Sequence, residues 1–226
     1  MNNKVTNNYN WQKYNKNNVV LSKKLKKYNN AFKVNYSENS YYNHTRDLFS
    51  LTLLEVKKIK VLDFGSNIAA LSNLKNKIDL KNTVFYIYDP FAYDKKLTLN
   101  IIKDIKVYVY NDLSLLKKIK FDVVHFGSSL QYLINYKKSI EMISFAKQCK
   151  ILITATPISF KKKYASKQKN HLNLIQYIHS FATLNIFFKK INFKLIFKSV
   201  LNINYASVLN LQKKTSFINL LYSNEK

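Results

Sequence analysis

Between Ile59 and Thr156 the sequence alternates between short apolar runs and helical patterns. The apolar runs have the length of strands and end at the glycine, proline or polar residues that form turns. They cover residues 59–64, 83–89, 106–111, 121–127 and 150–156. The helical patterns between them cover residues 66–77, 97–103, 112–118 and 139–148. Strands that alternate with helices are typical of right-handed βαβ units, so the sequence predicts a largely parallel sheet.

The flanking segments predict how this sheet begins and how it is closed. Residues 44–58 have apolar side chains near helical spacing and predict a helix that leads into the first strand. The polar, lysine-rich residues 158–170 predict a long loop, which favours a functional lid or a disordered insert. A helix at 171–188 and two strands at 192–200 and 203–212, joined by a tight turn, complete the pattern. The predicted fold is α/β, with a seven-stranded, mostly parallel sheet, a C-terminal antiparallel hairpin and helices on both faces.

The chain has 226 residues, which is enough for one domain with a substantial core. Residues 1–43 differ from the rest, because they hold 13 asparagines and few aliphatic side chains, although several tyrosines and a tryptophan lie among them. We therefore expect a partly ordered arm over residues 1–43 and a folded domain over residues 44–226.

The formal net charge of +26 raises nucleic acid or an anionic membrane as a partner. Of the 38 basic residues, however, only Arg46 carries the guanidinium fork that favours recognition of phosphates and bases. The abundant residues Asn, Ile, Tyr and Phe have A/T-rich codons, whereas the scarce Gly, Pro and Arg have G/C-rich codons. An AT-biased genome with a solvated lysine surface accounts for this composition, and a true polyanion site stays open as the alternative.

The cysteine content and the length of the apolar runs indicate the compartment. The single Cys149 excludes an intramolecular disulfide and a cysteine-based zinc cluster, and the apolar strand that follows it predicts a buried structural thiol. Residues 1–8 have no apolar segment of the signal-peptide type. No uninterrupted apolar run approaches the ~20 residues of a membrane span. We expect a cytoplasmic protein without a membrane span and without a metal site.

Four features fall at the carboxyl ends of successive predicted strands, where open α/β sheets bind ligands. Gly65 allows the backbone to approach a ligand, and the helix after it offers free N–H groups. Asp89 is an acid placed to accept hydrogen bonds from both hydroxyls of a ribose. Asn111 is placed to meet an adenine edge, and Gly127 opens a segment where a substrate would lie. The residues predicted to contact a nucleoside cofactor are Asp63, Gly65, Ser66, Asn67, Asp89, Pro90, Asn111, Asp112, Gly127 and Ser128.

Each feature also has an ordinary structural explanation when it is taken alone. Gly65 fits a simple strand-to-helix turn, and Asp89 with Pro90 fits a plain turn. Asp112 fits the N-cap of the next helix. The common edge, order and spacing of the four features favour a ligand site over these separate explanations.

Three stretches resemble motifs one, two and four of the class I S-adenosylmethionine-dependent methyltransferases. They are Val61-Leu-Asp-Phe-Gly-Ser-Asn67, Tyr88-Asp89 and Phe121-Asp-Val-Val-His-Phe-Gly-Ser-Ser-Leu-Gln-Tyr-Leu133. More narrowly, the Ser-Ser-Leu-Gln-Tyr-Leu run followed by Ile151-Leu-Ile-Thr-Ala-Thr-Pro157 resembles a family of bacterial methyltransferases whose members tend to belong to surface-polysaccharide biosynthesis. The resemblance covers roughly residues 45–212 and is more specific for the class than for the family.

This resemblance implies S-adenosylmethionine as the cofactor. Gly65 and its neighbours would face the methionine part, Asp89 would hold the ribose, and Asn111 and Asp112 would lie by the adenine. The chain departs from the class in motif one, where Asn67 and Ala69 stand in place of two further glycines. Asparagine tolerates left-handed backbone better than most residues, but its side chain narrows the space for a ligand.

The catalytic group is not defined by the sequence, because methyl transfer from a sulfonium needs little beyond positioning and a base. Gln131 and Tyr132 follow the fourth strand and are candidates to orient a substrate. His125 lies within that strand and is expected to be a packed residue. His171 and His179 follow the lysine-rich loop, so either could reach over the site, although a position on a surface helix is the expectation for both.

The sequence therefore predicts an S-adenosylmethionine-dependent methyltransferase that O-methylates a saccharide-linked or other small acceptor. One alternative is an RNA methyltransferase, which the lysine excess favours. The absence of an Asp-Pro-Pro-Tyr-like motif after the fourth strand weakens a base-methylating role. The other alternative is a non-catalytic protein of the same fold that has lost the cofactor, which Asn67 motivates. The oligomeric state is not predicted.

Overall fold

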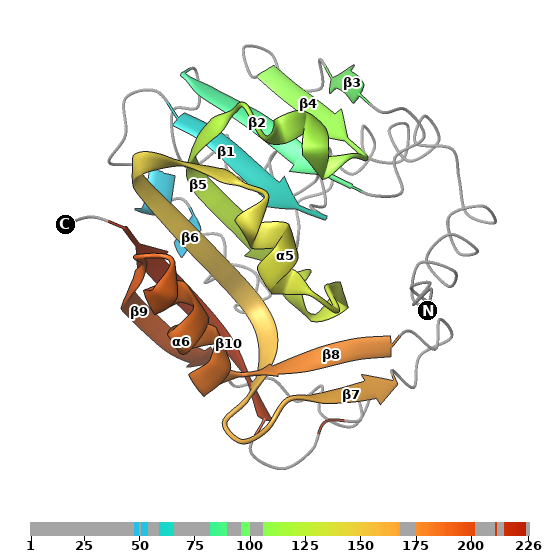
Figure 1. The fold of residues 1–226 in the computed structure, drawn as a ribbon, viewed down its shortest axis with the longest axis vertical. Coiled ribbons are helices and arrows are strands. Elements are labelled where there is room, and N and C mark those ends of the chain that lie inside the picture. Colours follow the sequence, from blue (N-terminus) through green and yellow to red (C-terminus); the bar gives the residue numbers. More distant parts are fainter. Residues whose placement is uncertain are drawn as a thin grey trace, which may run out of the picture.

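The structure is a computed structural model that describes residues 48–49, 51–53, 59–65, 82–89, 96–99, 106–167, 175–201, 211 and 215–224. They form one mixed sheet flanked by short helices (Figure 1). The strands are β1 (Ile59–Phe64), β2 (Thr83–Tyr88), β3 (Lys96–Leu99), β4 (Lys106–Tyr110), β5 (Lys120–Gly127), β6 (Ser144–Ser159), β7 (Tyr164–Lys167), β8 (Ile175–Ser180), β9 (Lys194–Leu201) and β10 (Thr215–Ser223). The helices are the 3₁₀ turns η1 (Leu113–Leu116) and η2 (Leu130–Tyr132) and the α-helices α5 (Tyr136–Glu141) and α6 (Phe181–Lys190), and residues 48–49 and 51–53 are also helical.

Seven of the strands follow the order β4-β2-β1-β5-β6-β10-β9, and β3 is added beside β4. The strands β4, β2, β1, β5 and β6 pair in parallel, while β10 is antiparallel to both of its neighbours. The predicted seven-stranded, mostly parallel sheet with antiparallel C-terminal strands is therefore confirmed. The antiparallel pair β7–β8 is an addition, and it joins the carboxyl end of β6 through two parallel pairs, Ile158↔His179 and Ser159↔Ser180.

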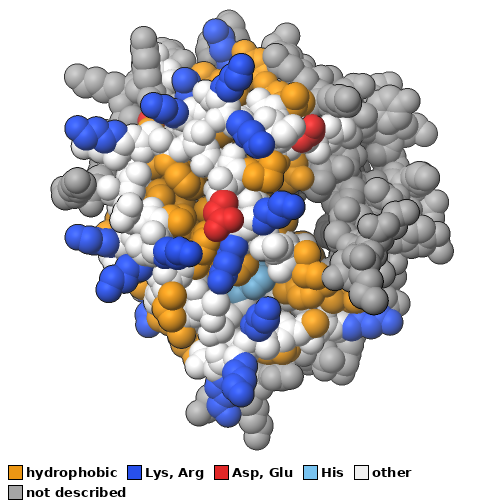
Figure 2. Space-filling view, viewed as in Figure 1, with side chains coloured by type: hydrophobic (Ala, Val, Ile, Leu, Met, Phe, Trp, Pro, Cys, Tyr) orange, Lys and Arg blue, Asp and Glu red, His pale blue; other side chains and the backbone are white. Residues whose placement is uncertain are grey.

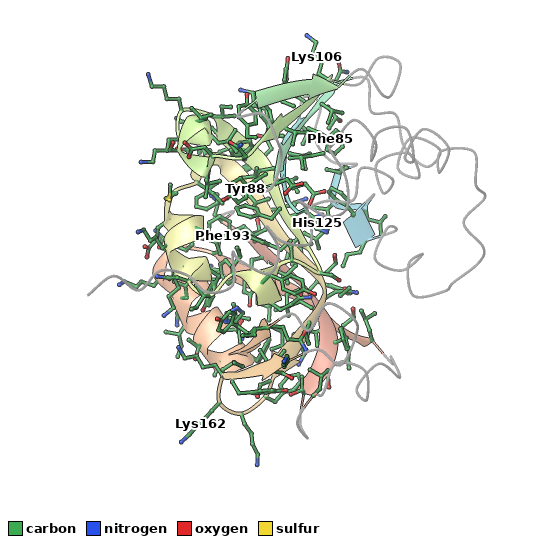
Figure 3. All side chains as sticks on the ribbon, turned by 90° about the vertical axis from the view of Figure 1, so that its right-hand side faces the viewer. Phe85, Tyr88, Lys106, His125, Lys162 and Phe193 are labelled. Atoms are coloured by element: carbon green, nitrogen blue, oxygen red, sulfur yellow. The ribbon has the colours of Figure 1, made fainter. Side chains whose placement is uncertain are left out.

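The central strands bury side chains on both faces of the sheet, as near-continuous apolar strands of parallel sheets do. Phe64 and Phe126 stack on the face covered by α5 and α6, with ring centroids 4.4 Å apart. Phe85 and His125 lie on the opposite face, where Phe49 of the helical residues 48–49 and 51–53 stacks on His125, and Figure 3 shows them across the sheet from Tyr88 and Phe193. Helices on both faces of the sheet are thus confirmed.

The C-terminal strands are antiparallel as predicted, but β9 pairs with a strand further along the chain than expected. The strand predicted at 192–200 is β9, and its partner is β10 at 215–223, whereas the strand predicted at 203–212 lies outside the described residues apart from Leu211. Packing stabilises β10 in its position, because it buries Leu220 and Tyr222 between β6 and β9.

Three helix predictions were also wrong in part. Residues 96–99 form β3, because their alternating Lys-Leu-Thr-Leu pattern pairs antiparallel with β4. The helix predicted at 139–148 ends at Glu141, and β6 begins shortly after it, at Ser144. In the segment predicted as a helix at 171–188, residues 175–180 form β8, and among its described residues only those of α6 are helical.

The strand β6 continues through Pro157, which was predicted to stop it. Pro157 lies between the last pair with β5, Gly127↔Thr154, and the first pair with β8, at Ile158. It follows a bulge at Ala155, whose φ of 51° is left-handed and whose N–H donates to Asn219 Oδ1 at 2.9 Å. Proline is tolerated in strands at such irregular positions.

The long loop predicted at 158–170 is largely replaced by regular structure. Ile158 and Ser159 belong to β6 and residues 164–167 form β7, so within the described residues only the turn at 160–163 remains of it. The arm at 1–43, the predicted helix at 66–77 and residues 168–170 lie outside the described residues. Among the described helices none is long and apolar enough to span a bilayer.

Candidate functional site

The carboxyl ends of β4, β2, β1 and β5 lie next to one another at one edge of the sheet. Backbone hydrogen bonds continue the ladder one residue past the strands. Gly65 N–H donates to Tyr88 O at 2.8 Å, Asp89 N–H donates to Tyr110 O at 2.9 Å, and Ser128 N–H donates to Thr154 O at 2.9 Å. The predicted residues Gly65, Asp89, Asn111, Gly127 and Ser128 are thereby brought together at this edge.

Gly65 has a left-handed backbone with a φ of 66°. A Cβ atom at this position would lie 3.4 Å from Cβ of Ser129, which follows the end of β5. Any side chain here would therefore combine backbone strain with a tight contact. The open backbone at the end of β1 is the feature that a cofactor-binding corner requires.

Polar side chains occupy the ends of β2 and β4. Asp89 and Asn111 are half-buried, and Asp112 is exposed. Asp112 Oδ1 accepts a hydrogen bond from Ser114 N–H at 2.8 Å and caps η1, so the ordinary structural role of this residue is present together with its position at the edge. Asp89 and Asn111 also make interactions within the fold.

A second cluster lies just beneath the edge and crosses three neighbouring strands. His125 Nδ1 in β5 lies 3.2 Å from Asp63 Oδ1 in β1, and His125 Nε2 is hydrogen-bonded to Thr154 Oγ1 in β6 at 2.8 Å. Asp63 is 1 % exposed, yet its Oδ1 and His125 Nδ1 lack well-aligned hydrogen bonds among the described residues. A buried carboxylate needs a close polar partner, and His125 is the partner that the sheet supplies.

The His125 ring is packed against Phe49 and Gly127. Phe49 stacks on its face with a centroid distance of 4.3 Å, and its Cε1 edge fills the space that a side chain at Gly127 would take. The expectation that His125 is a packed strand residue is confirmed, since it is 8 % exposed. Asp63 lies buried in β1, two residues before Gly65, and its predicted contact with a cofactor stays a prediction.

The turn after β5 is held to the bulge of β6. Ser128 Oγ donates to Ala155 O at 2.9 Å, and both residues have left-handed backbone, with φ values of 52° and 51°. Left-handed residues other than glycine are costly and concentrate at functional sites. Together with Gly65, they place three of the four described residues of positive φ at this one edge.

The turn η2 continues this edge and carries two polar groups without hydrogen-bond partners among the described residues. They are Ser129 Oγ and Gln131 Oε1. Gln131, a predicted substrate-orienting residue, is 5 % exposed, whereas Tyr132 is half-buried. Buried polar atoms without partners are uncommon in native proteins and mark places where a ligand or water binds.

His179 in β8 contacts the turn η2. It was expected on a surface helix, but it is buried in a strand, and its Nε2–H donates to Leu130 O at 3.2 Å. The pKa of the imidazole is lowered from its ordinary 6.5 to about 4, chiefly by burial and to a smaller extent by the charge of Lys163, while hydrogen bonds to the backbone of Leu130 and Leu133 act in the opposite direction. His179 therefore holds η2 in place as a neutral group, with Tyr136 edge-on at 4.6 Å.

No family model matches the sequence, and no curated protein matches it. Solved structures match the fold. The magnesium protoporphyrin IX methyltransferase from Synechocystis PCC 6803 with bound S-adenosylmethionine gives a TM-score of 0.51, with 16% identity over 85% of this chain and 86% of that chain. The 1,6-didemethyltoxoflavin-N1-methyltransferase from Burkholderia thailandensis with bound 1,6-didemethyltoxoflavin and S-adenosylhomocysteine gives 0.51, with 10% identity over 91% and 87%. The 16S rRNA methylase ArmA gives 0.50, with 18% identity over 91% and 98%.

The chain has the Rossmann-like class I methyltransferase fold. Identities of this size establish the fold alone. The three similar proteins act on different acceptors by their names, a porphyrin, a toxoflavin precursor and an rRNA, so the methyltransferase fold leaves the acceptor open.

Part of the predicted site of this methyltransferase fold lies outside the described residues. These predicted residues are Ser66, Asn67, Pro90 and His171. Over the described ranges, no group of three or more His, Cys, Asp or Glu residues is arranged to hold a metal ion.

The Asp63–His125–Thr154 contacts were missed from the sequence. Asp63 and His125 are separated by 62 positions, and they meet because β1 and β5 pair in a register that sets them opposite each other. No local pattern encodes that register. The available signal was a polar residue in each of three predicted apolar strands, two residues or fewer before a strand end.

Proposed function

We propose that the chain is an S-adenosylmethionine-dependent methyltransferase. The observation that carries the proposal is the row of four parallel strand ends with left-handed Gly65 at its centre and Asp89 on the neighbouring strand. Solved proteins of the same fold hold S-adenosylmethionine or S-adenosylhomocysteine, which supports this cofactor.

The residues at the edge fit such a group. Gly65, with Ser66 and Asn67 after it, would face the methionine part, because the left-handed backbone of Gly65 carries no side chain and can approach a ligand closely. Asp89 would accept hydrogen bonds from the ribose hydroxyls, and Asn111 with Asp112 would lie by the adenine. When bound, S-adenosylmethionine supplies an activated methyl group.

The acceptor in this proposal is a saccharide-linked or other small molecule that is methylated at oxygen. Gln131 Oε1 can only accept hydrogen bonds, and it is buried without a partner among the described residues. It would therefore orient an acceptor that carries hydroxyl donors, with Ser129 Oγ and Tyr132 beside it. The resemblance of residues 128–133 and 151–157 to polysaccharide-associated methyltransferases supports the same class of acceptor.

Thermal unfolding with a panel of adenosine ligands tests the cofactor. A ligand that binds only the folded chain raises the midpoint of unfolding, by about 5–10 °C at a hundredfold excess over its dissociation constant. We expect this shift with S-adenosylmethionine and S-adenosylhomocysteine but not with ATP or NAD. No shift with either of the two would favour the non-catalytic alternative.

The acceptor needs a separate experiment, with methyl-labelled cofactor and parallel incubations with oligosaccharides and with ribosomal RNA. Label in a saccharide fraction, stable to conditions that cleave methyl esters, is the expected result. Label in RNA alone would establish the nucleic-acid alternative instead.

A further inference from the structure

The C-terminal part of the chain has an unusual charge pattern. Residues 142–224 contain 13 lysines and neither Asp nor Glu, whereas eleven of the twelve acidic residues lie within residues 1–141. An AT-rich genome acts on both parts of the gene equally, so it does not explain why one part lacks acids. The segment without acids contains the strands β6 to β10 and the helix α6. These strands lie together at one end of the strand order.

Exposed apolar side chains concentrate on the same elements. Ile186 on α6 is 71% exposed, and Val200 and Ile196 on β9 are 57% and 55% exposed. Phe160, in the turn between β6 and β7, is exposed as well, whereas the exposed Phe197 lies on the other face of β9 from Lys198 and Val200. Isolated apolar residues are ordinary on a surface, but several on adjacent elements mark an interaction site.

The apolar and basic side chains form one surface. Lys198 Nζ on β9 lies 5.9 Å from the ring centroid of Phe160 and 5.2 Å from that of Phe181, the first residue of α6. The outward face of α6 carries Ile186 and, one turn later, Lys189 and Lys190. The turn after Phe160 adds the exposed Lys161, Lys162 and Lys163. We call the surface of the 160–163 turn, the outward side of α6 and β9 the basic face.

Figure 2 shows lysines and apolar side chains over the lower half of the visible face, with no acidic side chain among its described residues. Figure 1, in the same view, places α6, β9 and the turn between β6 and β7 in that half. The basic face is therefore positive and apolar at once.

We infer that the basic face binds the surface of an anionic lipid bilayer. A bilayer interface offers anionic headgroups to the lysines and an acyl boundary to the isoleucine, valine and phenylalanine side chains. The phosphates of a nucleic acid would match the lysines. The aliphatic side chains of Ile186, Ile196 and Val200, however, neither stack on bases as aromatic rings do nor donate hydrogen bonds to them. The basic face also lacks arginine, the residue that forks onto phosphates.

The test uses the full chain and flotation with vesicles of phosphatidylcholine, alone or with about 30 mol % phosphatidylserine, in about 0.15 M salt. The chain is expected to float only with the anionic vesicles. K161Q/K162Q/K163Q should weaken this binding about a hundredfold, because each lysine near a charged surface contributes about fivefold. The matched control is K117Q/K118Q/K120Q, which removes the same charge from exposed lysines around η1 and β5.

A second variant, I186S/V200S, separates apolar contact from charge. It keeps every lysine and changes two exposed side chains, so it should fold and yet bind anionic vesicles at least tenfold more weakly. No binding to anionic vesicles, or an equal loss in both lysine variants, would overturn the inference. Tighter binding to single-stranded RNA than to vesicles would also overturn it. These readouts need no methyl transfer, so they stand apart from the proposed function.

Discussion

A Cβ atom on Gly127 would lie 2.8 Å from Cε1 of His125, a separation that real Cβ atoms essentially never show. The two residues lie on the same face of β5, two positions apart. One of the two glycines of the chain is thus required by a neighbouring imidazole rather than by the backbone, since only Gly65 has a positive φ. The absence of a side chain at Gly127 leaves room for the His125 ring in the orientation that contacts both Asp63 and Thr154.

Replacement of Gly127 by alanine should destabilise the fold by about 1–3 kcal/mol, because the new methyl group displaces the ring. Urea unfolding of the two single variants and the double variant forms a cycle with His125→Ala. In the His125→Ala background Gly127→Ala should cost less than about 0.5 kcal/mol, because the obstructing ring is gone. An unchanged cost in that background would show that the two residues do not compete for space.

His179 predicts a pH dependence of stability. The unfolded imidazole binds a proton below pH 6.5, but the folded one, whose pKa burial lowers to about 4, does not, so stability falls as the pH falls from 6.5 to 4. Relative to His179→Gln, the wild-type chain should lose about 2 kcal/mol between pH 7.5 and pH 5. Denaturant unfolding of both proteins at the two pH values measures this difference. Parallel curves for the two proteins would mean that the imidazole titrates alike in both states.

Cys149 should react with a thiol reagent only when the chain opens. Its side chain is fully buried, and burial together with the charge of Asp122 raises the pKa of the thiol, against a weaker effect of the backbone at Ala146. Labelling with an aromatic disulfide should be at least a thousandfold slower in the native chain than in urea, and its rate should follow the unfolding equilibrium. Because Cys149 is the single cysteine of the chain, the labelling rate reports on this thiol alone. Rapid labelling under native conditions would contradict the buried position.

Asp89 should determine affinity for the cofactor without determining the fold. Its replacement by alanine removes a charged hydrogen-bond acceptor and should weaken binding of S-adenosylhomocysteine by about ten- to hundredfold. Asp122→Ala is the matched control, because this acid accepts from Lys60 N–H at the opposite end of β5 and β1. Equal losses in both variants would indicate a general effect of charge or stability and would remove Asp89 from the site.

Much of the sheet could be predicted because each parallel strand is a short apolar run with polar or turn-forming ends. The positions of Gly65, Asp89 and Gly127 follow from this, since parallel strands end at the same edge. Cys149 was also predicted as a buried thiol, and its fully buried side chain confirms this.

The features that could not be predicted depend on contacts between distant segments. The alternation in β8 resembles a helical run, and only its pairing with β6 and β7 makes it a strand. Similarly, the position of β10 depends on its pairing with β6 and β9, which lie far from one another in the sequence. The contact between Asp63 and His125 needs the register of β1 on β5, which no local pattern contains.

The central claim, that the strand ends around Gly65 bind S-adenosylmethionine, is tested most directly by isothermal titration of the full chain with S-adenosylhomocysteine. S-adenosylhomocysteine is what remains of the cofactor after methyl transfer, so it avoids turnover and would occupy the same site. We predict saturable heat with one site per chain and a dissociation constant below about 1 mM. The absence of heat at millimolar ligand, from a chain that unfolds cooperatively, would contradict the claim.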